Sequence, residues 1–267
     1  MDQLLQHALN ALILGGTYAL LGIGLTLIFG IMRVVNFTHG ELYSFGAYMM
    51  FLWVMQLGVT FLLALPLAML LGGMLGAAIE LLLLRRLRGA DIDTTMLVMI
   101  GAWIALQNGE QLYWSGVAQS IATANTNSRP HDSDTPPSTR LGKAMRATFQ
   151  DRDTAALMGV DIDAVHTATF AIGSGLAAAA GALLGPVFVV YPTMGDLASL
   201  KAFAVVILGG LGSIPGATAG GFILACVEEL GAGYLSSGYR DAMGFLLIIV
   251  ILLVRPTGLF ATRERVG

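Results

Sequence analysis

The feature that most constrains this chain is a stretch without a single charged side chain, which runs from Ala8 to Met32. About 20 apolar residues are enough for a helix to cross the hydrocarbon of a bilayer. The rest of the sequence is similar, since 56% of its 267 residues are hydrophobic and 12% are charged, against roughly 25% charged residues in soluble domains. The sequence therefore predicts an all-α, polytopic membrane protein and excludes an ordinary soluble globule.

Several function classes are disfavoured by what the sequence contains. The net charge of −3 gives no basic surface for nucleic acid. The start Met-Asp-Gln has no basic region, so the first apolar run is expected to be a retained span rather than a cleaved signal. The single cysteine, Cys226, excludes an intrachain disulfide and is expected to be a small core residue. The sequence has no Gly-Lys-Ser or Gly-Lys-Thr phosphate loop and no catalytic trio, so we predict no enzyme activity, no catalytic residue, no cofactor and no metal.

Apolar runs predict the membrane-spanning elements, and we expect about six to eight spans in total. The runs lie near residues 12–32, 42–57, 61–84 and 94–114, and then near 165–190, 202–230 and 242–254. The run 94–114 contains Gln107, Asn108, Glu110 and Gln111, which makes it poorly suited to face lipid.

The distribution of charge divides the chain. Eleven of its charged residues lie between Asn125 and Asp163. We expect an N-terminal transmembrane block (1–119), an atypical polar linker (120–139), a cytoplasmic loop (140–163) and a C-terminal transmembrane block (164–267). Basic residues mark the cytoplasmic side of a membrane protein, and here they are Arg33, Arg85, Arg86, Arg88, the basic residues from Arg140 to Arg152, Arg255, Arg263 and Arg265. Only the weak span at 94–114 lies between Arg88 and Arg140, although both of these residues mark the cytoplasmic side. Either that span is re-entrant or a span is missing.

Glycines recur at a spacing of four, which allows helix backbones to approach closely in lipid. The pairs are Gly72 with Gly76, Gly181 with Gly185, Gly212 with Gly216, and Gly216 with Gly220. In the run from Leu208 to Gly216, Gly209, Gly210, Gly212 and Pro215 are expected to break a helix at membrane depth. Broken backbone is tolerated there when it is buried in protein or lines a wet cavity.

A polar motif, Asn36-Phe-Thr-His-Gly-Glu41, follows the first run. Asn36 and Thr38 are expected to cap the next helix, and His39 with Glu41 lacks the third ligand that a zinc site needs. The motif is either a structural loop or part of a transport path.

Three carboxylates lie in or beside the apolar runs. Glu80 is expected to pair or to reach the cytoplasmic interface, and Glu228 and Glu229 are expected at an interface. We therefore predict no acid–base pair at membrane depth.

The polar loop carries short amphipathic helical pieces that end at Gly159, a residue typical of a helix stop. A rigid helix on a cytoplasmic loop indicates a docking element, and a solvated connector is the alternative.

The residues of this loop resemble a known family. Ala155-Ala-Leu-Met-Gly159, preceded by Gly142-Lys-Ala-Met-Arg-Ala, resembles the loop by which permeases of ABC importers contact their ATPases. Together with Asn36-Phe-Thr-His-Gly-Glu, the run from Lys201 to Ala217, and Arg255-Pro-Thr-Gly-Leu-Phe, it is similar to branched-chain amino acid ABC transporter permeases of the LivH type. The resemblance covers about residues 8–119 and 140–260. A similar subfamily moves urea, and the aromatic segment Glu41–Tyr48 favours amino acids.

The resemblance implies one of two permease subunits in the inner membrane, working with two ATPases and a periplasmic binding protein. It implies an ATPase-coupling loop that contains Gly142, Ala144, Arg146, Ala155, Ala156 and Gly159. It also suggests a translocation path near Asn36, Thr38, His39, Gly209, Gly210, Gly212 and Pro215. A stand-alone secondary transporter or channel is the alternative from another class, and it predicts ion-coupling carboxylates at mid-membrane.

The departure from the family lies between Ser120 and Thr139. Members continue there with a periplasmic segment and an apolar span, whereas this chain has a polar run with the composition of a disordered segment. We infer a deletion or a frame-shifted patch, which leaves one span fewer than in the family.

Overall fold

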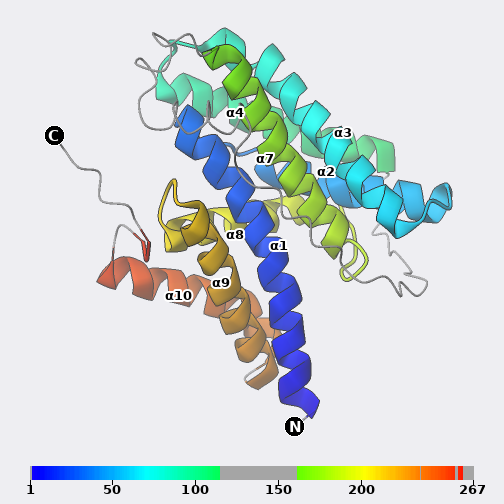
Figure 1. Cartoon of the computed structure of the whole chain (residues 1–267), viewed down its shortest axis with the longest axis vertical. Coiled ribbons are helices and arrows are strands. Elements are labelled where there is room, and N and C mark those ends of the chain that lie inside the picture. The colour runs from blue at the N-terminus through cyan, green and yellow to red at the C-terminus, as the bar shows by residue number, and fades with distance from the viewer. Residues whose placement is uncertain (1, 115–160, 235, 256–257, 261–267) are drawn as a thin grey trace.

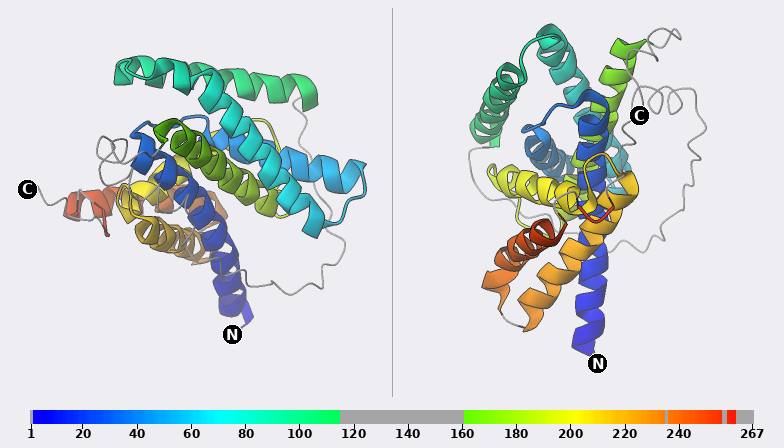
Figure 2. Two further views of the ribbon diagram at one scale, coloured as in Figure 1. Left: turned by 45° about the horizontal axis from the view of Figure 1, so that its top comes forward. Right: turned by 90° about the vertical axis from the view of Figure 1, so that its left-hand side faces the viewer.

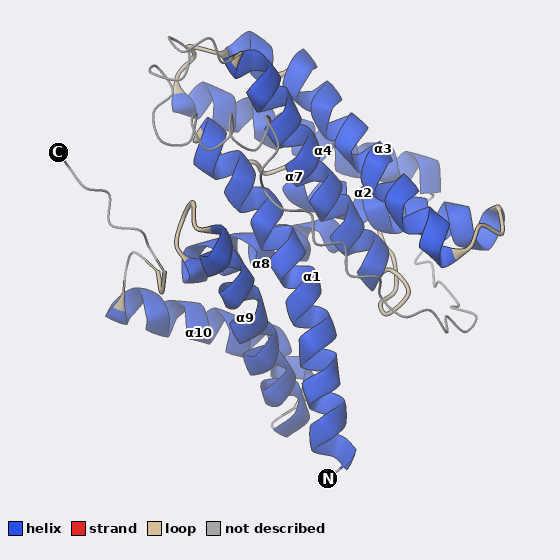
Figure 3. Cartoon of the chain, viewed as in Figure 1, coloured by secondary structure: helices blue, strands red, loops and turns tan. Residues whose placement is uncertain are grey.

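The computed structural model describes residues 2–114, 161–234, 236–255 and 258–260, and these residues form eight α-helices joined by loops (Figures 1 and 3). The predicted all-α class is confirmed. The helices are α1 (Asp2–Met32), α2 (His39–Phe51), α3 (Phe61–Leu82), α4 (Ile92–Trp114), α7 (Ile162–Leu184), α8 (Met194–Gly209), α9 (Ile214–Tyr234) and α10 (Arg240–Val254). A π-helical turn, Leu52–Gln56, extends α2, and 3-10 turns at Leu84–Leu87 and Ser237–Tyr239 follow α3 and precede α10.

Most helices lie where the apolar runs predicted them. The run expected over 165–190 ends earlier, because α7 stops at Leu184 before Gly185 and Pro186. Proline has no backbone N–H and disfavours helical geometry in the residue before it. Cys226 was expected in the core, and that prediction is wrong because the residue is exposed on α9.

Three helical stretches among the described residues are long and apolar enough to cross a membrane: Leu5–Met32, Phe61–Leu87 and Ile162–Leu184. The helices α8 and α9 add a fourth span if the pair, bent by 118°, counts as one. The six to eight expected spans would also require α2, α4 and α10, which do not qualify by length and composition alone.

The helix α1 runs through the middle of the molecule (Figure 1). It packs against α7, α8 and α9. The helix α7 in turn packs against α2 and, most extensively, α3. Helices from the two halves of the sequence therefore interleave in one bundle, and α4 lies at its edge (Figure 2).

Small residues make the closest helix contacts, as the glycine spacing predicted. A Cβ added at Gly24 of α1 would lie 2.6 Å from the carbonyl oxygen of Gly173 in α7. On the other side of α7, the faces carrying Gly72 and Gly76 of α3 leave no room for a Cβ against Ala178 and Ser174. With little hydrophobic force between helices in lipid, such close backbone approach is what holds a bundle together.

The predicted helix break is confirmed between α8 and α9. Gly210 and Gly212 have φ values of +100° and +83°, a region that glycine adopts without strain. The carbonyl groups that end α8 find partners far along the chain, since the N–H of Leu259 donates to Leu208 (2.9 Å) and that of Phe260 to Gly209 (3.1 Å). The C-terminal motif Arg255-Pro-Thr-Gly-Leu-Phe therefore supplies hydrogen-bond donors to the end of α8, at the break between α8 and α9.

Replacing Gly181 by Ala is expected to destabilise the bundle, because the added Cβ overlaps the carbonyl oxygen of Tyr43 in α2. Overpacking of this kind costs about 1–3 kcal/mol. We expect a lower unfolding temperature in detergent for Gly181→Ala. Gly101→Ala in α4 is the matched control, since nothing lies within 4 Å of its added Cβ. Equal unfolding temperatures for the two variants would contradict this account of the packing.

Candidate functional site

The motif Asn36-Phe-Thr-His lies deep inside the bundle. Asn36, Thr38 and His39 are fully buried. Although α1 ends at Met32, the chain folds back, so that His39 Nε2 lies 2.9 Å from the carbonyl oxygen of Leu21. Leu21 is close to the middle of the candidate span Leu5–Met32. The motif therefore brings polar groups to the middle of α1.

The capping prediction is wrong for Thr38. Its hydroxyl donates to Asn36 Oδ1 (2.6 Å), which also accepts the Thr38 N–H (3.1 Å), and no side-chain oxygen caps α2. Within the described part of the chain, Asn36 Nδ2 and His39 Nδ1 have no hydrogen-bond partner although both are buried. Thr26, Tyr48 and Ser174 likewise have buried hydroxyl groups without a partner in the described part of the chain, so the bundle holds several such atoms and two of them lie in this motif.

The N-termini of α2 and α8 meet beside this motif. The Gly40 N–H donates to the Ser199 hydroxyl (3.0 Å), and a Cβ at Gly195 would lie 2.7 Å from the Gly40 carbonyl oxygen. Each helix has a carboxylate in its first turn, Glu41 in α2 and Asp196 in α8. Carboxylates at these positions offset the partial positive charge of a helix N-terminus.

The polar face of α4 turns towards these two carboxylates. Trp103 Nε1 lies 3.0 Å from Glu41 and 3.2 Å from Asp196, and Gln107 donates to Asp196 (2.9 Å). Glu110 is buried and accepts from the Ser44 hydroxyl (2.8 Å). Of the polar residues that made α4 a poor lipid-facing helix, Gln107 and Glu110 therefore contact α8 and α2. Asn108 and Gln111 are exposed, as are apolar side chains such as Leu112.

The two groups of predicted path residues lie on neighbouring elements but do not form one cluster. The Phe37 ring, within the first group, packs 5.8 Å from the ring of Phe203 in α8, centroid to centroid. Gly209, Gly210 and Gly212 lie further along, at the end of α8, and Pro215 is in the first turn of α9. Gly209 and Gly216 touch across the break.

An acid–base pair that the sequence was expected to lack is present inside the bundle. Lys201 Nζ lies 2.8 Å from Glu228 Oε2, and Glu228 is 2% exposed. Tyr18, also near the middle of the first span, donates to Glu228 (2.8 Å) and accepts from Lys201 (2.7 Å). The structure shows that Glu228 is buried, and its predicted place at a membrane interface stays a prediction. A lysine inside an apolar run was the available signal, because such a residue needs a buried partner.

Glu229 is likewise buried and has partners of its own. It accepts from Arg240 Nη2 (2.7 Å) and from Asn10 Nδ2 (3.1 Å), and His7 lies 3.5 Å away. The adjacent glutamates thus anchor the start of α10 and the N-terminal half of α1 to α9. Glu229 is only 3% exposed, and its predicted place at a membrane interface stays a prediction.

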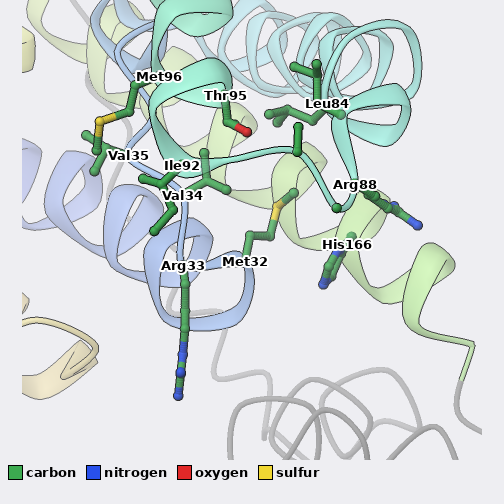
Figure 4. A pocket seen from close by; sticks show the side chains of 13 residues that line it. Met32, Arg33, Val34, Val35, Leu84, Arg88, Ile92, Thr95, Met96 and His166 are labelled. Atoms are coloured by element: carbon green, nitrogen blue, oxygen red, sulfur yellow. The ribbon is translucent and has the colours of Figure 1, made fainter.

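Two of the cavities among the described residues lie in different parts of the bundle. The larger, of about 370 Å³, adjoins Lys201 and is lined by α1, α2, α8, α10 and the end of α7. The smaller, of about 250 Å³, lies between the segment after α1, the segment before α4 and the start of α7 (Figure 4). The Arg33 side chain at its rim points away from its apolar lining (Figure 4).

Ion pairs join α3 to the start of α7 beside the smaller cavity. Arg88 pairs with Glu80 (2.6 Å) and with Asp163, and Arg85 pairs with Asp163 (3.1 Å). Glu80 also accepts from the Thr167 hydroxyl (2.6 Å). The expectation that Glu80 pairs is confirmed, and the network places Arg85, Arg88 and the beginning of α7 at one end of the molecule.

All residues predicted for the ATPase-coupling loop lie outside the described residues: Gly142, Ala144, Arg146, Ala155, Ala156 and Gly159. The described chain resumes at Asp161, whose carboxylate accepts the Ala164 N–H (3.1 Å) and caps α7. This loop therefore leads directly into α7 and its ion pairs with α3.

Comparison with known proteins points to a single family of membrane permeases. Residues 7–131 and 137–254 match the family model for the permease component of the branched-chain amino acid transport system. Among similar proteins are the high-affinity branched-chain amino acid transport system permease proteins LivH of Salmonella typhimurium (34% identical), LivH of Escherichia coli K12 (35%) and BraD of Pseudomonas aeruginosa (34%). Each alignment covers 97% of this chain and 96% of the relative. No solved structure matches.

The relatives contain residues that have no counterpart in this chain. The alignment with the Salmonella protein extends over 302 positions, more than the 267 residues of the chain. The family match is interrupted at residues 132–136, inside the polar segment 120–139.

Replacing Lys201 by Met is expected to be strongly destabilising, because it leaves Glu228 charged and buried without its cation. Breaking a buried ion pair from one side costs about 3–5 kcal/mol. The double variant Lys201→Met/Glu228→Gln is expected to recover most of the loss in unfolding temperature. Arg85→Met is the control, since its pair with Asp163 is half-exposed and worth about 1 kcal/mol or less. A double variant no more stable than Lys201→Met would overturn this assignment.

Proposed function

The chain belongs to the permease family of branched-chain amino acid transport systems, and from this premise we propose that it is the membrane-spanning subunit of an importer for leucine, isoleucine, valine or a similar solute in the inner membrane. The observation that carries the proposal is the likeness to such permeases over nearly the whole chain. Membership of a transport-system permease family decides against a stand-alone secondary transporter or channel.

The partners follow from the kind of system. A permease of an ABC transport system works with ATPase subunits and a solute-binding protein, and this sequence has no phosphate-binding loop of its own. We propose two ATPases, a second permease subunit, which is either a homologue or an identical copy, and a periplasmic binding protein. The free energy of ATP hydrolysis then shifts the bundle between two conformations.

Residues 140–163 are proposed as the ATPase-coupling loop, with Gly142, Ala144, Arg146, Ala155, Ala156 and Gly159 at the contact. Support comes from the end of the loop, where Asp163 pairs with Arg85 and Arg88. A displacement of the loop would therefore reach both α7 and α3.

We propose that solute passes near Asn36, Thr38 and His39, and that Gly209, Gly210, Gly212 and Pro215 provide the broken segment near this path. Support comes from the two buried polar atoms without partners, Asn36 Nδ2 and His39 Nδ1, and from the helix break itself. Interrupted helices with polar groups at mid-depth are typical of solute paths in membrane transporters.

Residues 120–139 are proposed to replace a span that relatives possess. The interruption of the family match and the greater length of the relatives support this proposal. Resequencing the coding region for Ser120 to Thr139 tests it, because a corrected frame that restores an apolar span would identify a sequence error, and an intact frame would make the shortened topology real.

Uptake of labelled solutes tests the proposed function. The chain is co-expressed with its partner permease, ATPases and binding protein in cells that lack high-affinity leucine uptake. We expect ATP-dependent uptake of leucine that unlabelled isoleucine and valine inhibit, and no uptake of labelled urea. Uptake of urea without leucine would favour the similar subfamily, and uptake of neither solute would contradict the proposal.

Gly159→Arg tests the coupling loop. The bulky cation at the proposed helix end is expected to reduce co-purification of the ATPases with the permease by about tenfold, a loss of about 1.4 kcal/mol of binding free energy. Gly159→Ala, which adds neither the charge nor the bulk of arginine, is the control. Unchanged association of Gly159→Arg with the ATPases would show that the loop lies elsewhere.

A further inference from the structure

The larger cavity of the bundle has the size and the lining of a small-molecule site. Its volume of about 370 Å³ falls within the range of about 300–1,000 Å³ that is typical of ligand pockets. One wall is apolar and is formed by Leu21, Leu184, Phe188, Val189, Met194 and Leu197. The lining also contains three charged residues, Lys201, Arg240 and Asp241. The cavity thus pairs an aliphatic wall with charges of both signs.

Asp241 and Arg240 have more hydrogen-bonding atoms than their ion pairs use, so both can also bind a ligand. Asp241 accepts from Lys201 Nζ through Oδ1 (3.0 Å), and its side chain is 47% exposed. Arg240 donates through Nη2 to Glu229 (2.7 Å), and a guanidinium carries five N–H donors in all. A carboxylate and a guanidinium therefore stand side by side at the first turn of α10, both facing the cavity.

The balance of charge selects among ligands. The two cations Lys201 and Arg240 pair with three carboxylates, Asp241 and the glutamates behind it, Glu228 and Glu229. An anion such as a phosphate would meet no excess of positive charge here. A ligand that carries one charge of each sign, close together, has a partner for both charges and adds no net charge to a buried site.

We propose that this cavity binds the transported amino acid within the permease, an inference that rests on the proposed function. Asp241 accepts from the α-ammonium group, Arg240 donates to the α-carboxylate, and the aliphatic side chain packs against Leu184, Phe188 and Leu197. Lys201 is a positioning residue, because its bond to Oδ1 orients the Asp241 carboxylate. Selection for a branched aliphatic side chain then comes partly from the permease and not only from the binding protein.

The place of the cavity fits a receiving site. Thr17, Tyr18 and Leu21 of its lining lie near the middle of the first span, and Arg240 and Asp241 lie at the end opposite the basic cluster of Arg85 and Arg88. Because basic clusters mark the cytoplasmic side, the cavity lies on the half that faces the binding protein. Leucine released there reaches the cavity before it reaches the buried motif that contains His39.

The test measures binding of labelled leucine to the transporter complex in lipid nanodiscs without the binding protein. Leu197→Trp fills the cavity and is expected to weaken leucine binding about tenfold or more, as expected when a pocket loses the volume that a ligand side chain occupies. Leu200→Trp is the matched control, because Leu200 lies on the same helix, is 51% exposed and does not line the cavity.

Two analogues that each lack one charge separate recognition from a structural effect. Leucinamide lacks the carboxylate, and 4-methylpentanoate lacks the ammonium group. Asp241→Asn is expected to remove the preference for leucine over 4-methylpentanoate, and Arg240→Gln the preference for leucine over leucinamide. Loss of a charge-assisted hydrogen bond changes each affinity ratio by about tenfold. A purely structural role would lower all affinities together and leave these ratios unchanged.

Uptake by the complete transporter, measured in parallel, keeps the two proposals apart. Two results would overturn the site and leave the proposed function standing, provided that the wild type takes up leucine. One is that leucine does not bind to the complex. The other is that none of the three substitutions changes leucine binding or the analogue ratios. No leucine uptake by the wild type overturns the proposed function, and the site falls with it. Weaker binding by Leu197→Trp and charge-selective shifts in the other two variants establish the site.

Discussion

A backbone N–H or C=O in hydrocarbon has no water to bind, and this requirement governs the interior of the bundle. A continuous helix meets it without help, but this chain starts α2 and α8 inside the bundle and breaks α8 from α9. Each of these helix ends has a specific hydrogen-bond partner. Ser199 accepts the Gly40 N–H at the start of α2, and the N–H groups of Leu259 and Phe260 serve the carbonyl groups that end α8. The interrupted helices are stable because segments from distant parts of the chain complete their hydrogen bonds.

Close backbone contact supplies the rest of the stability and explains where charge can be tolerated. Glycine and alanine faces bring α7 against α1, α2 and α3. Where larger polar side chains enter the bundle, they come with partners: Lys201 with Glu228, Arg240 with Glu229, and Trp103 with Glu41 and Asp196. These charges are thus concentrated on α2, on the broken pair α8 and α9 and at the start of α10, rather than along α1 and α7.

The sequence predicted the helices well because apolar length and glycine position are local properties. The break at Gly209 to Pro215 and the packing role of Gly72, Gly76 and Gly181 could be predicted for the same reason. The pair Lys201–Glu228 could not, because it depends on how α8 and α9 fold against each other across the break. The Thr38 error has a local origin, since Asn36, two residues earlier, accepts both the N–H and the hydroxyl of Thr38.

The helix α7 connects the proposed coupling loop with the larger cavity. It begins at Asp161, where the proposed coupling loop ends, and its first turn is held by Arg85 and Arg88. It ends at Leu184 in the wall of the larger cavity, about 34 Å away at 1.5 Å per residue over its 23 residues. Because Gly173 and Gly181 leave no gap against Gly24 and Tyr43, α7 cannot tilt without moving α1 and α2. A displacement applied at Asp163 therefore reaches the cavity and the buried motif around His39 through one rigid, closely packed element.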